Sequence, residues 1–151
     1  MKTIFIGVGN GFRRDDGAGL YIVRQLRKKL ESITTISFAE SHGEGSSLME
    51  MWQSFDKVFL FDAVMINGEP GKRYYLQASR ENIPTDFFKY SSHAFSLAEA
   101  VEMARVLGKL PESLEVYGIE GKDFSHGEEL CPEVLHSCHE LIEEIIHAWT
   151  K

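Results

Sequence analysis

The chain has 151 residues, 43% of them hydrophobic, and its 16 Lys and Arg against 23 Asp and Glu give a formal net charge of −7. This length and hydrophobic content predict a single domain, residues 1–151, with one full core. The negative charge argues against a nucleic-acid or anionic-membrane surface, because both need a basic footprint. The apolar run near the N-terminus is far shorter than a signal-peptide core or a membrane span. The two cysteines are spaced for neither a disulfide framework nor a zinc half-site. We therefore expect a cytoplasmic protein.

The first part of the chain predicts a buried strand, a glycine-rich loop and a helix. Thr3 to Val8 is a short, β-branched-rich apolar run, and the loop GNGFRRDDG follows it. The next apolar residues repeat at helical spacing and form one stripe: Ala18, Ile22, Leu26 and Leu30. We expect Asp15 or Asp16 to cap the N-terminus of this helix, where carboxylates are favoured.

The rest of the chain alternates strand and helix patterns. Strands are predicted at 33–39, 57–62, 73–77 and 114–119, and helices at 48–52, at 96–108 and from Pro132 onward. The strand at 57–62 is apolar on both faces, and the one at 73–77 is expected at an edge or antiparallel. This order predicts an α/β fold, a three-layer α-β-α sandwich whose mostly parallel sheet has about five strands.

Three polar side chains are expected to converge at one edge of this sheet. Asp16 follows the first strand, Asp62 ends the central strand, and His93 precedes a helix. Ligands of open α/β sheets bind outside the carboxyl ends of the strands, and two carboxylates with an imidazole suit a divalent metal. Each residue also has a simpler interpretation: a helix cap for Asp16, a turn residue for Asp62 and a solvated side chain for His93. Spacing alone leaves both readings open.

Four sequence blocks resemble the hydrogenase maturation endopeptidases, in the order of that family and over nearly the whole chain. They are IFIGVGNGFRRDDGAGLYIVRQL, VFLFDAV, SSHAFSLAEAVEMARVLG and VYGIEG. The resemblance implies a peptidase that removes the C-terminal extension of the large-subunit precursor of a nickel–iron hydrogenase after nickel insertion. It also implies that Asp16, Asp62 and His93 recognise nickel carried by that precursor, with no permanently bound cofactor. We expect a monomer or a weak oligomer.

One block departs from the common family form. Many members have an Asp-Gly-Gly-Thr stretch after the second strand, whereas this chain has ESHGEG from Glu40 onward. This form is similar to the maturation proteases of bidirectional, NAD-reducing hydrogenases. Glu40 is then either a polarising carboxylate in place of the common Asp or a residue that caps a turn. Asp16 and Glu40 are the candidates for a general base towards water, and nickel is either a Lewis acid or only a recognition tag.

Two other functions compete with the protease. The same three ligands would serve a non-cleaving maturation chaperone that recognises nickel, with the aromatic residues 87–90 either docking a partner or filling the core. The glycines after the first strand also resemble those of a nucleotide-binding α/β protein. That alternative is remote, because Phe12 takes the third glycine position and two aspartates would repel a pyrophosphate. The two functions are distinguished by the fate of the precursor: a protease shortens it and dissociates, whereas a chaperone forms a stable complex with the uncut precursor.

Overall fold

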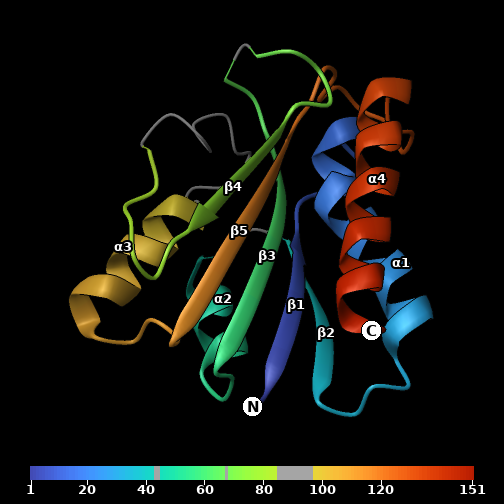
Figure 1. Cartoon of the computed structure of the whole chain (residues 1–151). Coiled ribbons are helices and arrows are strands. Elements are labelled where there is room, and N and C mark those ends of the chain that lie inside the picture. The colour runs from blue at the N-terminus through green and yellow to red at the C-terminus, as the bar shows by residue number, and fades with distance from the viewer. Residues whose placement is uncertain (43–44, 67, 85–96) are drawn as a thin grey trace.

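A five-stranded sheet lies between two pairs of helices in the computed structural model, which describes residues 1–42, 45–66, 68–84 and 97–151 (Figure 1). The chain forms, in order, β1 (Thr3–Val8), the 3-10 turn η1 (Arg14–Gly17), α1 (Ala18–Leu30), β2 (Ile36–Ser41), α2 (Gly45–Trp52), β3 (Lys57–Val64), β4 (Arg73–Gln77), α3 (Leu97–Leu107), β5 (Ser113–Glu120) and α4 (Pro132–Trp149). The predicted α/β sandwich, with its mostly parallel sheet of five strands, is confirmed.

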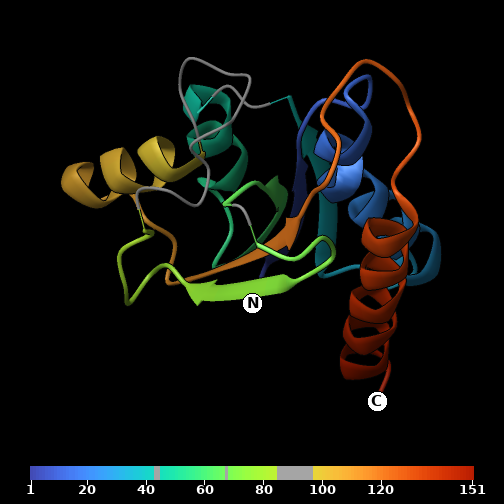
Figure 2. The same ribbon diagram turned by 90° about the horizontal axis from the view of Figure 1, so that it is seen from above.

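The strand order is β2-β1-β3-β5-β4, and only β4 runs antiparallel to its neighbour. The carboxyl ends of β1, β2, β3 and β5 therefore meet at one edge, onto which Figure 2 looks down. The chain winds outward from β1 to β2 and then returns to β3 on the other side of β1. This reversal makes the carboxyl ends of β1 and β3 the switch point of the sheet, where open α/β folds bind ligands.

Alternation along the strands divides the core between the two faces of the sheet. One face packs against α1 and α4 through Phe5, Phe59 and Phe61. The other packs against α2 and α3 through Ile4, Ile6, Val58 and Leu60. Each of these buried side chains stabilises the fold by about 1.5–3 kcal/mol relative to an exposed position. The sheet is therefore held from both sides, as Figure 1 shows.

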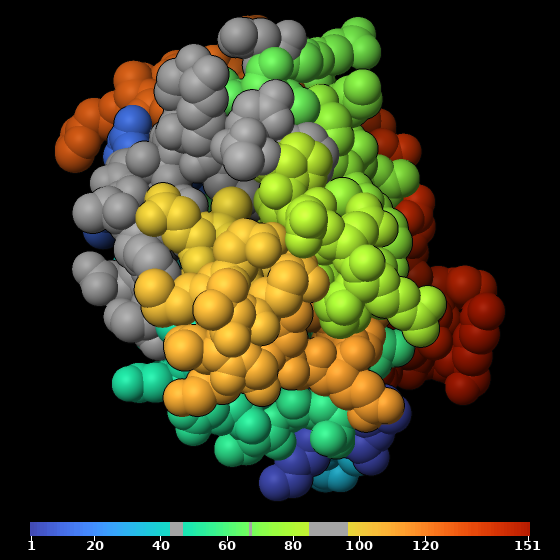
Figure 3. Space-filling view, turned by 90° about the vertical axis from the view of Figure 1, so that its left-hand side faces the viewer, coloured from blue at the N-terminus to red at the C-terminus, as the bar shows by residue number. Residues whose placement is uncertain are grey.

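The face formed by α3 and the segment 68–84 is shown in Figure 3. The inner side of α3 buries Leu97, Ala100, Val101 and Ala104. Its outer side leaves Met103, Val106 and Leu107 exposed.

No helix among the described residues is long and apolar enough to cross a membrane. Ser96 and the aromatic residues 87–90, two features of the sequence predictions, lie outside the described residues.

Two local predictions are wrong, namely the bounds of the second strand and the cap of α1. The strand predicted at 33–39 is β2 at Ile36–Ser41, because the amides of Ile33 and Ile36 donate turn hydrogen bonds to the carbonyls of Leu30 and Ile33 (3.0 and 3.1 Å). Glu40 consequently lies within a strand and not in a turn. The expected carboxylate cap of α1 is also absent, because Gly17 occupies the N-cap position and no side chain bonds to it there.

Glycine lets α1 begin directly against the sheet. A β-carbon at Gly19 would overlap the carbonyl oxygens of Phe61 and Val8, so only glycine allows this approach. The start of α1 therefore rests on the carboxyl ends of β1 and β3. The turn η1, which carries Asp15 and Asp16, precedes it and lies at the switch point of the sheet.

Candidate active site

Asp15 anchors the loop between β1 and α1 to the connection between β5 and α4. Its side chain is completely buried, and its oxygens accept hydrogen bonds from three backbone amides: Lys122 (2.8 Å), Asp123 (2.9 Å) and Cys131 (2.8 Å). Three charge-assisted bonds satisfy a carboxylate well even without water. Asp15 is therefore a structural residue that fixes the position of its neighbour, Asp16.

Backbone bonds tie the same two segments together at further points. The Arg14 amide donates to the Gly127 carbonyl (2.8 Å), and the Gly127 amide donates to the Phe12 carbonyl (2.9 Å). Arg14 adopts a φ of 43°, a left-handed conformation that costs a non-glycine residue free energy and persists only where surrounding contacts impose it. The loop is thus held in one shape by residues more than a hundred positions later in the chain.

Asp16 and Asp62 form a pair of buried carboxylates at the switch point, each only 7% exposed. Asp16 accepts a hydrogen bond from the Asn10 amide (3.1 Å), and Asp62 accepts one from the adjacent Ala63 amide (2.8 Å). Burial raises the pKa of Asp62 well above its ordinary value, and the neighbouring Asp16 carboxylate raises it further, against the smaller opposite effect of the Ala63 amide. Two desolvated acids of this kind attract a cation, which removes their repulsion.

The third predicted ligand, His93, lies outside the described residues. Within residues 1–42, 45–66, 68–84 and 97–151, no three His, Cys, Asp or Glu side chains are grouped closely enough to hold a metal ion. The described part of the chain therefore contributes two carboxylate oxygen donors at this position. Both donors are of the type that borderline divalent cations accept together with imidazole or thiolate.

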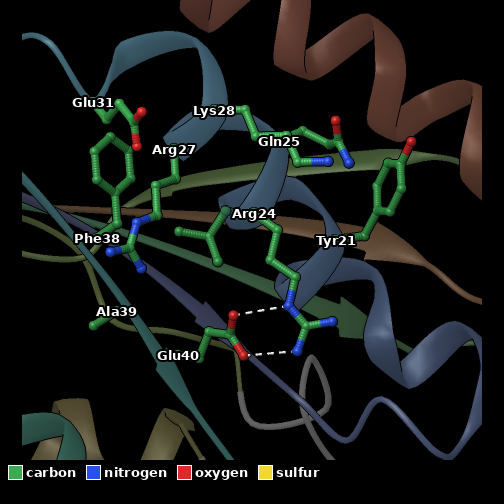
Figure 4. Close-up of a pocket in the computed structure, with 10 residues that line it drawn as sticks. Tyr21, Arg24, Gln25, Arg27, Lys28, Glu31, Phe38, Ala39 and Glu40 are labelled. Atoms are coloured by element: carbon green, nitrogen blue, oxygen red, sulfur yellow. Dashed lines mark hydrogen bonds and ion pairs between the residues drawn. The ribbon is translucent and has the colours of Figure 1, made fainter.

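Glu40 lies apart from this carboxylate pair. Its oxygens accept hydrogen bonds from Nε and Nη2 of Arg24 on α1, both at 2.8 Å (Figure 4). These bonds lower the pKa of Glu40, although partial burial acts in the opposite direction. Glu40 is paired in register with Gly7, which is itself paired with Phe61, so Glu40 faces α1 as Phe61 does. Asp62, one residue further along β3, points to the opposite face of the sheet.

Glu120 is a buried acid that the sequence analysis did not single out. Only 1% exposed at the end of β5, it accepts hydrogen bonds from the Ile66 amide (3.1 Å) and the Tyr74 hydroxyl (3.4 Å). Glu120 is paired in register with Val64, the last residue of β3, which lies two residues after Asp62. Its hydrogen bond with the Ile66 amide therefore fixes the chain just after β3. A buried strand that ends in a carboxylate was the signal used for Asp62, and the sequence YGIEG shows the same signal.

The two cysteines are unsuited to nucleophilic catalysis. Burial raises the pKa of the Cys138 thiol to about 12, with a smaller effect from Asp15. Burial and a hydrogen bond to Asp15 raise the pKa of Cys131 to about 11. Both side chains are therefore protonated near neutral pH, and the thiolate is the nucleophilic form. The carboxylate pair remains the chemically distinctive feature of the described structure.

Comparison with known proteins points to one family. The sequence model described as Hydrogenase maturation protease (HycI) matches residues 20–148. The hydrogenase 2 maturation protease of Escherichia coli is 24% identical over 150 residues, which cover 98% of this chain and 90% of the relative. The hydrogenase expression/formation protein HupD of Bradyrhizobium diazoefficiens is 24% identical over 134 residues, covering 88% of this chain and 70% of the relative.

Solved structures share the same fold. The hydrogenase maturating endopeptidase HybD of E. coli superposes with a TM-score of 0.77 at 21% identity, covering 98% of this chain and 91% of its own. The [NiFe] hydrogenase maturation protease HybD of Thermococcus kodakarensis gives a TM-score of 0.72 at 22% identity and covers 100% of both chains. At these identities the likeness concerns the arrangement of helices and strands.

Proposed function

The chain belongs to the hydrogenase maturation proteases, and we propose that it removes the C-terminal extension of the large-subunit precursor of a nickel–iron hydrogenase once nickel has been inserted. The observation that carries this proposal is the buried pair of Asp16 and Asp62 at the switch point of the sheet. A hydrolase needs polar groups fixed beside the scissile bond. Asp16 follows a loop bonded at several points to another part of the chain, and Asp62 lies in strand β3.

The nickel ion belongs to the substrate in this proposal. Asp16, Asp62 and His93 complete the coordination of an ion that the precursor already holds, so a precursor without nickel lacks the group that the site recognises. The electrostatics of the pair support this role, because a divalent cation offsets both the burial and the mutual repulsion of the carboxylates. The metal also offers Lewis-acid chemistry at the scissile carbonyl.

We assign the general-base role to Asp16 and not to Glu40. Asp16 lies beside Asp62, whereas Glu40 faces α1 and both of its oxygens are bonded to Arg24. A base has to reach the water that attacks the substrate, and an acid on the other face of the sheet is badly placed for that. Asp16→Asn is accordingly expected to lower the cleavage rate at least about 100-fold, and Glu40→Gln to leave it nearly unchanged.

The test is an incubation of the protein with nickel-loaded and nickel-free precursor, read by intact-mass spectrometry. Loss of a C-terminal peptide only from the nickel-loaded precursor is the expected result. Cleavage of both precursors would contradict recognition through nickel. A stable complex with uncut precursor would instead identify a maturation chaperone. An Asp16→Asn variant that keeps its circular-dichroism spectrum and still cleaves at the wild-type rate would overturn the assignment of the base.

A further inference from the structure

A groove opens between α1 and β2, on the face of the sheet that carries Glu40. It has a volume of about 780 Å³, and its floor is formed by Phe38, Ala39 and Glu40 of β2. Figure 4 shows the long side chains of Arg24 and Arg27 extending from α1 over this strand. The groove thus combines a strand surface with a cationic wall, in a protein whose net charge is −7.

The outer edge of β2 is left open by the described strands. β2 is the last strand in the sheet order and pairs only with β1. The carbonyls of Thr35 and Ser41 accept hydrogen bonds from Thr3 and Gly9 on the β1 side (3.1 and 3.0 Å). In a parallel ladder alternate residues bond to opposite sides. The main-chain groups of Phe38 and Glu40 therefore point away from β1, towards the edge.

This edge lacks two of the residue types that commonly protect an exposed strand. The sequence ISFAES of β2 contains no proline and no lysine. Its residues alternate between the two faces, so a strand added beside Phe38 and Glu40 would also place every second side chain over the α1 face. An edge of this kind accepts an extended peptide by main-chain pairing, with side-chain specificity supplied by the flanking groove.

The charges in the groove indicate which side chains a bound peptide would carry. Glu40 is already bound by Arg24. Among the described residues, neither Arg27 nor Lys28 forms an ion pair within 4.0 Å, although both line the groove. Glu31 is the one other acid in the lining. Two lysine or arginine side chains without a close partner favour a segment that carries acidic residues on the side facing α1.

We infer that an extended, acidic segment of the large-subunit precursor adds a strand to the free edge of β2 and places its carboxylates against Arg27 and Lys28. This inference rests on the proposed function, since the occupant is the precursor. The added strand would lie three strand spacings from β3, about 14 Å. Four or five extended residues span that distance, so a segment that leaves the added strand at the carboxyl edge of the sheet is long enough to reach the end of β3.

Charge reversal tests the cationic wall. Arg27→Glu and Lys28→Glu are each expected to weaken precursor binding about tenfold and to raise KM while kcat stays near the wild-type value. Lys29→Glu is the matched control, because it makes the same charge change on the same helix but lines a different groove, against α4. Equal binding by all three variants would overturn the inference, even if the wild-type protein cleaves the precursor normally.

Residue-resolved amide hydrogen exchange of the isotope-labelled protein tests the added strand. Saturation with the precursor is expected to slow exchange of the Phe38 and Glu40 amides at least about tenfold, while the Ser37 and Ala39 amides, which face β1, change little. Unchanged exchange at Phe38 and Glu40 in the bound protein would overturn the inference. This measurement needs binding and no cleavage, so a protein that bound the precursor this way without cutting it would refute the proposed protease and still support the docking edge.

Discussion

Two buried carboxylates, those of Asp15 and Asp62, lie in neighbouring regions of this molecule and differ in the number of hydrogen-bond donors around them. Asp15, in the anchor between the first loop and the β5–α4 connection, accepts bonds from three backbone amides. Asp62, at the switch point, accepts one amide hydrogen bond from the part of the chain that the structure describes and experiences the repulsion of Asp16. Burial is common to both, so the supply of donors decides what a buried charge does. The first carboxylate stabilises the fold, and the second is left electrostatically unfavourable until a cation or a proton arrives.

The anchor and the site are adjacent in sequence, since Asp15 and Asp16 are neighbours. The backbone bonds around Asp15, Arg14 and Gly127 hold Asp16 in place without contacting a substrate themselves. Functional sites often contain a group that lowers the stability of the fold, and surrounding hydrogen-bonded segments hold that group in place. Substitutions in the two regions should consequently change stability in opposite directions.

Asp15→Ala is expected to have the largest effect on stability. It leaves the amides of Lys122, Asp123 and Cys131 without their acceptor, and each such loss costs about 1–3 kcal/mol. The free energy of unfolding should fall by about 3 kcal/mol or more in urea denaturation. Glu129→Ala, on an exposed position of the same connection, should change it by less than about 0.5 kcal/mol. A small effect of Asp15→Ala would mean that the anchor contributes little.

Asp62→Asn is expected to abolish processing and yet stabilise the metal-free protein. The amide keeps the size of the side chain and removes the buried charge beside Asp16, a change that commonly adds about 1 kcal/mol. Denaturation at pH 7 measures the gain, and the precursor assay measures the loss of activity. A destabilised variant at pH 7 would contradict the description of Asp62 as an unfavourable buried charge.

The stability gain of Asp62→Asn is expected to depend on pH. The pKa of Asp62 is raised in the folded state, so this carboxyl group favours folding at low pH, where it is protonated, and loses that contribution as the pH rises through the raised pKa. The stability advantage of Asp62→Asn should therefore be present at neutral pH and shrink on acidification, disappearing below the ordinary Asp pKa of 3.8. A gain that is constant with pH would point to a packing effect in place of charge.

Much of this architecture could be predicted from local patterns. The apolar run 3–8 corresponds to β1, which is buried at every residue, and the helical stripe from Ala18 to Leu30 corresponds to α1, which buries the face that this spacing defines. The start of β2 could not be predicted in this way. Ile33 looks like a strand residue, but its amide is used in the turn that closes α1. Local hydrogen bonding thus outweighed the apolar pattern.

The site could be predicted less completely than the fold. The convergence of Asp16 and Asp62 follows from where parallel strands end, which the order of elements implies. The role of Asp15 does not follow, because its partners at positions 122, 123 and 131 are far away in sequence. The same holds for Glu40, whose ion pair with Arg24 depends on the packing of α1 over β2. Contacts of this kind are set by tertiary structure alone.

Glu40 supplies a third carboxylate environment and the smallest expected effect. Its ion pair with Arg24 is solvent-accessible, with side chains 34% and 56% exposed, and such pairs contribute about 0.5 kcal/mol or less after solvent screening. Glu40→Gln should therefore lower the free energy of unfolding by no more than this amount at low salt, and by less in 1 M NaCl. The lowered pKa of Glu40 means that the contribution is present near neutral pH and is lost as the pH falls through that pKa. If Glu40→Gln lowered the free energy of unfolding as much as Asp15→Ala, an exposed ion pair would stabilise the fold as much as three buried amide hydrogen bonds. The conclusion that the number of hydrogen-bond donors decides the effect of a buried carboxylate would then be wrong.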